Sequence, residues 1–151
     1  MRSSFRLRLV SLAALLLPWS LLACSGNGND PISCDRDGAT LDDGLRVRDI
    51  DCGNGPGVES GFSAIVNYTA SLEGQEPFDD TAGEAYTFRL GSGQVVSGWD
   101  QGLAGMQVGG VRELVVPPEL AYGEAGFAPH VPPDSTVTYE VELLAINEPD
   151  E

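Results

Sequence analysis

The residue types in this chain offer little covalent or metal chemistry. Among the 151 residues there is one histidine, His130, with three cysteines and no lysine. No Ser-His-Asp, Cys-His or paired-carboxylate arrangement stands out that could act as a nucleophile or as an acid and base. A zinc site built on two cysteines would lack further ligands. We therefore predict no metal site and no cofactor, and the remaining candidates for chemistry are aromatic side chains.

Residues 91–106 are predicted to form a loop that leads into one short helix. Ser97 and Asp100 have the spacing of a capping box, with Asp in place of the usual Glu, so the helix should begin near Gly98. Gly105 is expected to adopt the left-handed conformation that commonly follows a helix end. Such a helix has fewer than three turns and is not stable alone in water. Another element must therefore pack on it.

Trp99 offers the largest apolar surface for that contact. It lies four residues before Leu103, so the two side chains would share one face of the helix. Trp99 could be a plain core residue. Alternatively, one side of its ring could be packed in the core while the other lines a binding site.

Five further segments are rich in β-branched and aromatic residues or alternate apolar with polar residues. We predict strands at 45–50, 62–72, 85–90, 111–116 and 136–146. In the first strand, Leu45 and Val47 form the apolar face, joined after a slip by Ile50. A hairpin turn at Glu73-Gly74 ends the second strand. Strands with a single short helix between them indicate an α+β fold in which an antiparallel sheet wraps the helix.

The connection from Pro117 to Ser135 is much longer than the usual connection of roughly two to six residues. It is rich in Pro and Gly but also contains Leu120, Tyr122, Phe127 and Val131. Loops of such length are usually functional or disordered. The aromatic and apolar residues favour a packed, functional loop.

Length and charge limit the number of domains and the partners. A chain of 151 residues is long enough for one domain rather than two. The formal net charge is −15, and phosphate binding needs clustered basic side chains, so we expect no nucleic-acid partner. We interpret the acidity as a solvated surface that keeps the protein soluble. A monomer is expected.

Residues 1–23 have the pattern of an export signal. Three arginines precede an apolar run from Leu9 to Ala23, which fits a signal peptide rather than a membrane-spanning helix. The run ends in Leu-Leu-Ala-Cys24, which resembles the bacterial lipobox, where the signal is cut before a cysteine that is then acylated. An ordinary signal peptide with an incidental cysteine is the alternative. The resemblance implies a membrane anchor at Cys24 in the cell envelope, and Ser25 favours the outer membrane, facing the periplasm.

Export makes a disulfide the expected state of Cys34 and Cys52, because they are an even pair in an oxidising compartment. Two separate thiols are the alternative. Residues 25–40 are dominated by Ser, Gly, Asn and Asp with almost no apolar periodicity, which predicts a flexible tether. Together with the lipid-bearing Cys24, residues 24–40 would hold the domain off the membrane.

Six short segments recur in a recognisable order along the predicted domain. They are Val66–Thr69, Phe78-Asp79, Gly98–Leu103, Ala121–Gly123, Val131–Pro133 and Val141–Leu144. In order and spacing they resemble the FKBP family of peptidyl-prolyl cis/trans isomerases, over about residues 45–147. The resemblance implies an α+β fold, with an antiparallel β half-barrel wrapped around one short α-helix. It assigns residues 41–148 to an isomerase domain and 149–151 to an acidic tail.

The resemblance also implies an apolar aromatic pocket whose floor under the proline ring is Trp99. It assigns catalysis to Tyr68, Phe78, Asp79, Trp99 and Tyr122, and substrate binding to Tyr86, Val95, Val96, Phe127, Val131 and Tyr139. Tyr86 and Tyr139 stand where the family often has Phe, which adds hydroxyl groups to the wall. Phe127 stands where the best-known members carry His, and His130 lies at the rim. These departures bear on substrate preference.

Some of these residues have simpler alternatives. Asp79 could cap its loop or pair with Arg89 or Arg112. Tyr68 and Val66 alternate on one strand, so one of them could be an ordinary core residue.

The function implied by the resemblance is the acceleration of X-Pro bond rotation in exported proteins. Its substrates would be proline-containing polypeptides, and a macrolide is a candidate ligand. Rotation requires no nucleophile, because a dry pocket that prefers the twisted amide lowers the barrier. The alternative is a non-catalytic binding module or holdase chaperone for proline-containing segments on the same fold.

Overall fold

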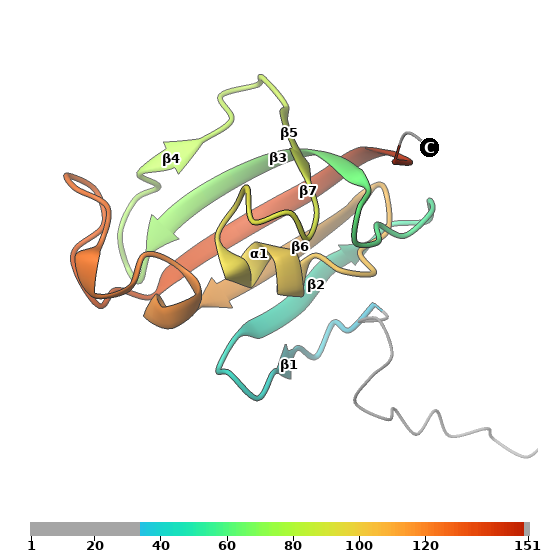
Figure 1. Cartoon of the computed structure of the whole chain (residues 1–151). Coiled ribbons are helices and arrows are strands. Elements are labelled where there is room, and N and C mark those ends of the chain that lie inside the picture. The colour runs from blue at the N-terminus through green and yellow to red at the C-terminus, as the bar shows by residue number, and fades with distance from the viewer. Residues whose placement is uncertain (1–33, 150–151) are drawn as a thin grey trace, which may run out of the picture.

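The structure is a computed structural model and describes residues 34–149. Within this range the strands are β1 (Ala39–Thr40), β2 (Arg46–Cys52), β3 (Ser63–Leu72), β4 (Asp79–Asp80), β5 (Tyr86–Arg89), β6 (Gly110–Val116) and β7 (Val137–Asn147). The helix α1 spans Ser97–Gly102, and two 3-10 helices, η1 (Pro118–Leu120) and η2 (Gly123–Ala125), follow β6 (Figure 1). None of the described helices has the length and hydropathy needed to cross a bilayer.

The strands form one antiparallel sheet with α1 across one face (Figure 1). Its order is β1-β2-β6-β7-β3-β4, and β5 also pairs with β3. The two ends of this order do not pair with each other within residues 34–149, so the sheet is open rather than closed. The five predicted strands are present with small shifts at their ends, and the predicted α+β arrangement of an antiparallel sheet with one short helix is confirmed.

The longest pairing joins β3 to β7, from Ser63 opposite Asn147 to Leu72 opposite Val137. Along the first part of β7, buried apolar residues alternate with exposed or half-buried polar ones, as a strand with one face in the core requires. The turn predicted at Glu73-Gly74 is also confirmed. It returns the chain into β4, which pairs with β3.

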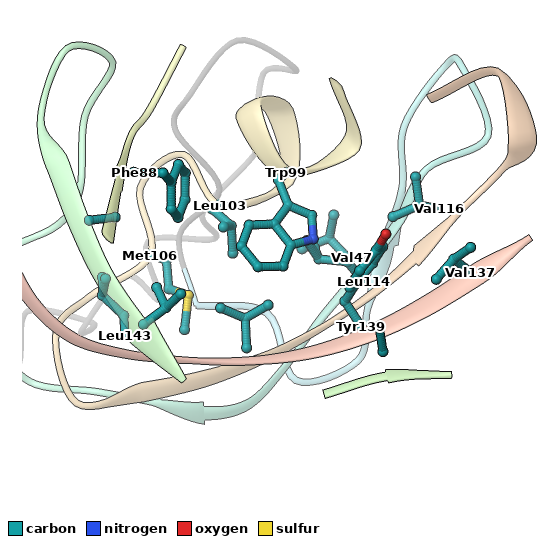
Figure 2. Close-up of a cluster of buried hydrophobic side chains, with 14 of the residues drawn as sticks. Val47, Phe88, Trp99, Leu103, Met106, Leu114, Val116, Val137, Tyr139 and Leu143 are labelled. Atoms are coloured by element: carbon teal, nitrogen blue, oxygen red, sulfur yellow. The ribbon is translucent and has the colours of Figure 1, made fainter. Parts of the chain in front are cut away.

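The core lies between the inner face of the sheet and α1 (Figure 2). Two glycines of the helix, Gly98 and Gly102, face β6. A Cβ on Gly102 would come within 2.6 Å of Leu114 Cδ2, and one on Gly98 would collide with Val116. Because these glycines have no side chain, the helix backbone packs close to β6 and carries Trp99 into the core.

The start of α1 differs from the predicted capping box. The helix begins at Ser97 itself, after Val96, and no side chain caps its first turn. The Asp100 carboxylate instead accepts two hydrogen bonds, at 2.8 and 3.2 Å, from backbone N–H groups of the preceding loop. The Asp100 side chain, which was expected to complete the helix cap, therefore binds backbone groups of the loop instead. Gly105 has the predicted positive φ, 75°, but lies beyond the residue that directly follows the C-cap.

Ile50 was predicted on the apolar face of β2, and this is wrong: it is 44% exposed. The pairing with β6 shifts between Asp49 and Asp51. Asp49 faces inward instead, and its carboxylate pairs with the buried Arg112 of β6 at 2.6 Å. Arg112 also donates to the carbonyl oxygen of Gly102 at the end of α1, at 2.9 Å. The buried ion pair therefore connects β2, β6 and the helix.

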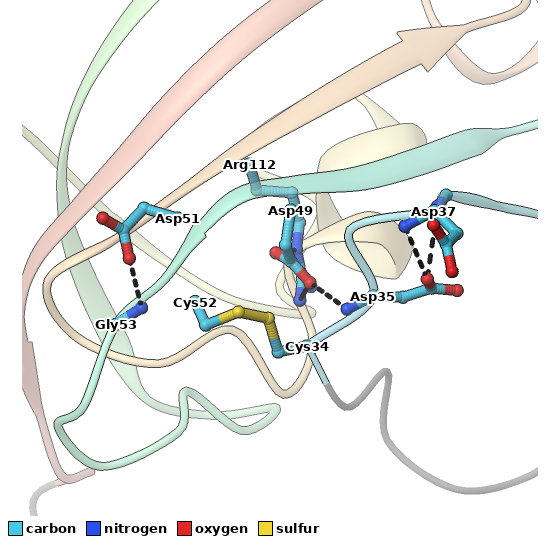
Figure 3. The surroundings of a disulfide bond; sticks show 9 residues. Cys34, Asp35, Asp37, Asp49, Asp51, Cys52, Gly53 and Arg112 are labelled. Atoms are coloured by element: carbon cyan, nitrogen blue, oxygen red, sulfur yellow. Dashed lines mark hydrogen bonds and ion pairs between the residues drawn. A yellow bond between two sulfur atoms is a disulfide. The ribbon is translucent and has the colours of Figure 1, made fainter.

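The segment 34–40 was predicted to belong to the flexible tether, but the structure shows it packed on the domain. Ala39 and Thr40 pair with β2 as β1. Cys34 and Cys52 form a disulfide, as predicted, with their Cα atoms 5.3 Å apart (Figure 3). The backbone N–H of Asp35 donates to the Asp49 carboxylate at 2.8 Å. The rest of the predicted tether, the signal and Cys24 lie outside the described residues.

Candidate functional site

A cavity of about 510 Å³ opens beside α1. Its wall draws on β3, β4, β5, β7, the segment that leads into α1, and the loop after β6. Eight of the predicted site residues line it: Tyr68, Asp79, Tyr86, Val95, Val96, Trp99, Tyr122 and Tyr139. Segments more than 70 residues apart in the chain thus meet around one hollow.

Three predicted site residues are not among those that line this cavity. Phe78 is half-buried and stacks on His130, with ring centroids 6.2 Å apart. Phe127 is 53% exposed and stacks on Tyr122 at 5.3 Å, so it supports a wall residue from outside. Val131 is buried in the core. The long loop after β6 is therefore packed, as predicted, but its Phe127 side chain faces solvent.

Two tyrosine rings stand nearly perpendicular to the Trp99 ring. Tyr68 lies at 5.1 Å and 82°, and Tyr139 at 5.3 Å and 86° (Figure 2 shows Tyr139). Such edge-to-face contacts are favourable for aromatic pairs. Trp99 is only 3% exposed, and its indole nitrogen has no hydrogen-bond partner among the described residues. Trp99 therefore serves both the core and the cavity wall.

Asp79 is held at the cavity by Tyr68, whose hydroxyl donates to the carboxylate at 2.8 Å. Burial, and secondarily this hydrogen bond, raise the pKa of the Tyr68 phenol, so it stays protonated as the donor. The alternative ion pairs of Asp79 do not form. Arg89 donates to the Gly61 carbonyl at 2.9 Å, and Arg112 pairs with Asp49.

Two further hydrogen-bond donors belong to residues that line the cavity, Tyr122 and Val96. The Tyr122 hydroxyl accepts a hydrogen bond from the Tyr139 hydroxyl at 3.3 Å, which leaves its own proton available. The backbone N–H of Val96 donates to no protein acceptor within residues 34–149. The cavity thus combines aromatic and aliphatic side chains with several polar groups, which is the pattern of a ligand-binding site.

A sequence model of the FKBP-type peptidyl-prolyl cis-trans isomerase family matches residues 55–144, more than half of the chain. The chain belongs to this family. The match contains every residue that lines the cavity of the FKBP domain.

Curated and structural relatives agree with this assignment. The FKBP domain is 46% identical over 108 residues to peptidyl-prolyl cis-trans isomerase FKBP15-3 of Arabidopsis thaliana, covering 69% of this chain and 75% of that one. It is 42% identical over 106 residues to FK506-binding protein 4 of Dictyostelium discoideum, covering 70% of this chain but only 29% of that protein. Among solved structures, FkpA from Escherichia coli superposes with a TM-score of 0.68 at 37% identity, covering 76% of this chain and 53% of that one.

Three residues that line the cavity of the FKBP domain were not predicted: Gln94, Ser97 and Ala121. The Gln94 side chain accepts a hydrogen bond from the Arg89 backbone at 2.8 Å, which ties the loop before α1 to β5. All three are sequence neighbours of predicted residues. Their position next to Val95, Val96 and Tyr122 in the sequence was the one feature that could have predicted them as site residues.

Proposed function

We propose that this FKBP domain accelerates cis/trans rotation of X-Pro bonds in polypeptides. The observation that carries the proposal is the cavity of about 510 Å³ with Trp99 at its wall in edge-to-face contact with Tyr68 and Tyr139. Rotation about an amide has a barrier of ~18–20 kcal/mol, because the twisted state loses resonance. A site that binds the twisted amide better than the planar one lowers this barrier without forming a covalent bond.

The lining residues support this role in two ways. Trp99, Val95 and Val96 exclude water from the proline ring and the amide nitrogen. The Tyr122 hydroxyl and the Val96 N–H are placed to hold carbonyl groups of the substrate. Once a bound substrate displaces water from the cavity, these few donors act more strongly than they would in solution. No proton transfer to or from the substrate is needed.

Asp79 is proposed to orient the amide carbonyl electrostatically. Its carboxylate lies at the cavity wall and is fixed by the Tyr68 hydroxyl. Because the negative charge is held near the rotating bond, it favours one orientation of the carbonyl dipole over the others. The contribution should be modest, since Asp79 is exposed to solvent.

The proposal is tested by a protease-coupled assay on a Xaa-Pro peptide with purified protein. We expect the slow phase of cleavage to become faster in proportion to protein concentration. A protein that binds the peptide but leaves this phase unchanged would be a binding module or holdase, and the isomerase proposal would be wrong. Binding is followed in parallel by isothermal titration with the same peptide.

Asp79→Asn should lower kcat/KM by about 2- to 10-fold, which is the usual worth of one hydrogen bond or local charge contact. The apolar walls remain, so turnover should persist. Asp80→Asn is the matched control: it removes the same charge from the neighbouring residue of β4, which does not line the cavity. An equal loss in both variants would show that only overall charge matters. A fall of Asp79→Asn to background would indicate a chemical role beyond orientation.

We further propose that the protein is exported and held on a membrane through lipid at Cys24. The apolar run before Cys24 and its lipobox-like end support this, and the disulfide between Cys34 and Cys52 fits an oxidising compartment. The domain should then act on exported proteins in the cell envelope, at the periplasmic face of the outer membrane. The full chain has a net charge of −15, and removal of the three signal arginines makes the mature protein more negative. Anionic headgroups should therefore repel it, so lipid alone must hold it.

Cys24→Ser should therefore release an active protein from the membrane fraction. Each buried methylene of an acyl chain contributes about 0.8 kcal/mol, and two or three chains suffice for stable anchoring. Wild-type protein should stay with membranes in high salt, because its attachment is not electrostatic. The measurement is fractionation of cells followed by immunoblotting. Cys24→Ser protein that still pellets with membranes after signal cleavage would contradict the lipoprotein proposal.

A further inference from the structure

Tyr139 lies deeper in the domain than any other tyrosine at the cavity. It sits on β7 and is 3% exposed, whereas Tyr86 is 41% exposed. Its ring stands perpendicular to Trp99, and its hydroxyl donates to the Tyr122 hydroxyl at 3.3 Å. The ring is fixed by the core, so the position of its hydroxyl is fixed as well.

Tyr122 itself has fewer restraints. It lies on the loop between η1 and η2, directly before Gly123, and its ring is half-buried. Phe127 stacks on one face of this ring at 5.3 Å but is itself exposed. Within residues 34–149, the bond from Tyr139 is the one hydrogen bond made by the Tyr122 hydroxyl. The core therefore positions the Tyr122 hydroxyl through Tyr139.

The direction of this bond matters chemically. A phenol hydroxyl has one proton and accepts through its lone pairs. Because Tyr139 uses its proton toward Tyr122, the Tyr122 proton remains available for another acceptor. Burial, followed by the hydrogen bond with Tyr122, raises the pKa of Tyr139, so its hydroxyl keeps its proton. A donor that accepts a hydrogen bond is also polarised, and so donates more strongly.

We infer that Tyr139 is a positioning residue, whose hydroxyl holds and polarises the Tyr122 hydroxyl as the donor to a carbonyl of the bound proline segment. This inference rests on the proposed isomerase function and adds a residue that acts through another rather than on the substrate. The aromatic ring of Tyr139 contributes to the cavity wall, and its hydroxyl positions the Tyr122 hydroxyl.

The test is a double-mutant cycle on kcat/KM with Tyr139→Phe and Tyr122→Phe. Tyr139→Phe keeps the ring and removes the hydroxyl, so the thermal midpoint should stay close to that of the wild type. We expect each single variant to lose about 2- to 10-fold in kcat/KM. The double variant should lose no more than Tyr122→Phe alone, because the Tyr139 hydroxyl has no role once its partner is absent.

Tyr86→Phe serves as the comparison, since it removes another hydroxyl at the cavity that makes no bond to Tyr122. Its effect on kcat/KM should be the same with and without the Tyr122 hydroxyl. The inference would be overturned if Tyr139→Phe left kcat/KM unchanged or unfolded the protein. It would also be overturned if Tyr139→Phe lowered kcat/KM by the same factor in the Tyr122→Phe variant as in the wild type. An inactive wild type would instead refute the isomerase proposal, so the two failures are distinguishable.

Discussion

Trp99→Leu is expected to remain folded and to lose about 10- to 100-fold in kcat/KM. Leu fills part of the core volume of Trp but presents less aromatic surface to the cavity. Losing one aromatic contact with a bound proline corresponds to about 1.5–3 kcal/mol of transition-state binding. Trp99→Ala should lose activity too, but with an additional destabilisation of about 3–5 kcal/mol from the space left in the core. The measurements are isomerase kinetics and thermal unfolding followed by circular dichroism.

Phe88→Leu is the matched control for Trp99→Leu. Phe88 is equally buried and contacts Trp99, with ring centroids 5.4 Å apart, but it does not line the cavity. It should lower the unfolding midpoint with little effect on kcat/KM. If both variants lost activity in proportion to their stability, Trp99 would be an ordinary core residue. Full activity in folded Trp99→Leu would exclude it from the site.

Asp49→Ala should lower the free energy of unfolding by about 3–5 kcal/mol. Both members of the Asp49–Arg112 pair are buried, and the variant would leave the Arg112 charge in the core without its carboxylate. Arg112 also donates to the Gly102 and Ala104 carbonyls, so its displacement would disturb the end of α1. Urea denaturation of the disulfide-intact protein measures the change.

The exposed ion pair between Arg48 and Glu113 provides the comparison. Its atoms lie 3.1 Å apart, but the two side chains are 51% and 30% exposed. Glu113→Ala should therefore change the free energy of unfolding by about 0–1 kcal/mol. Similar effects of Asp49→Ala and Glu113→Ala would contradict the structural role given to the buried pair.

The parts of the fold that could be predicted from the sequence are those that local pattern determines. Segments 62–72 and 136–146 alternate or are rich in β-branched residues, and they became the long pair β3 and β7. The helix around Trp99 was predicted from the spacing of Ser97 and Asp100, the apolar pair Trp99 and Leu103, and Gly105 after its end, although the predicted cap does not form. The disulfide between Cys34 and Cys52 was predicted from their even number together with the expected export of the chain.

The parts that could not be predicted depend on contacts between distant segments. A slip in the alternation was predicted to place Ile50 inward. In the structure the alternation continues from Val47 to Asp49, which is buried against Arg112, 63 residues away, and the register with β6 shifts only after Asp49. Asp100 was assigned to the helix cap, although it binds the loop before the helix. The segment 34–40 has the composition of a linker, yet pairing with β2 and the disulfide fix it on the domain.

The site was largely predictable because the family resemblance supplied residues that local pattern does not connect. Eight of those residues line one cavity in the structure. Phe78, Phe127 and Val131 do not line it. The loop after β6 folds on itself, with Phe127 paired to Val131, and Phe78, which directly precedes β4, stacks on His130 of this loop. The hydrogen bond from Tyr139 to Tyr122 could not be predicted, since nothing in the sequence relates these two hydroxyls.

The most direct test of the central claim is the rate of X-Pro interconversion at equilibrium. Exchange NMR on an Ala-Pro peptide measures this rate without a protease, in the presence of catalytic amounts of the protein. We expect faster exchange between the cis and trans signals with wild-type protein and much slower exchange with Trp99→Leu at the same concentration. Exchange with wild-type protein that is no faster than in buffer, under conditions where the peptide binds, would contradict the isomerase function.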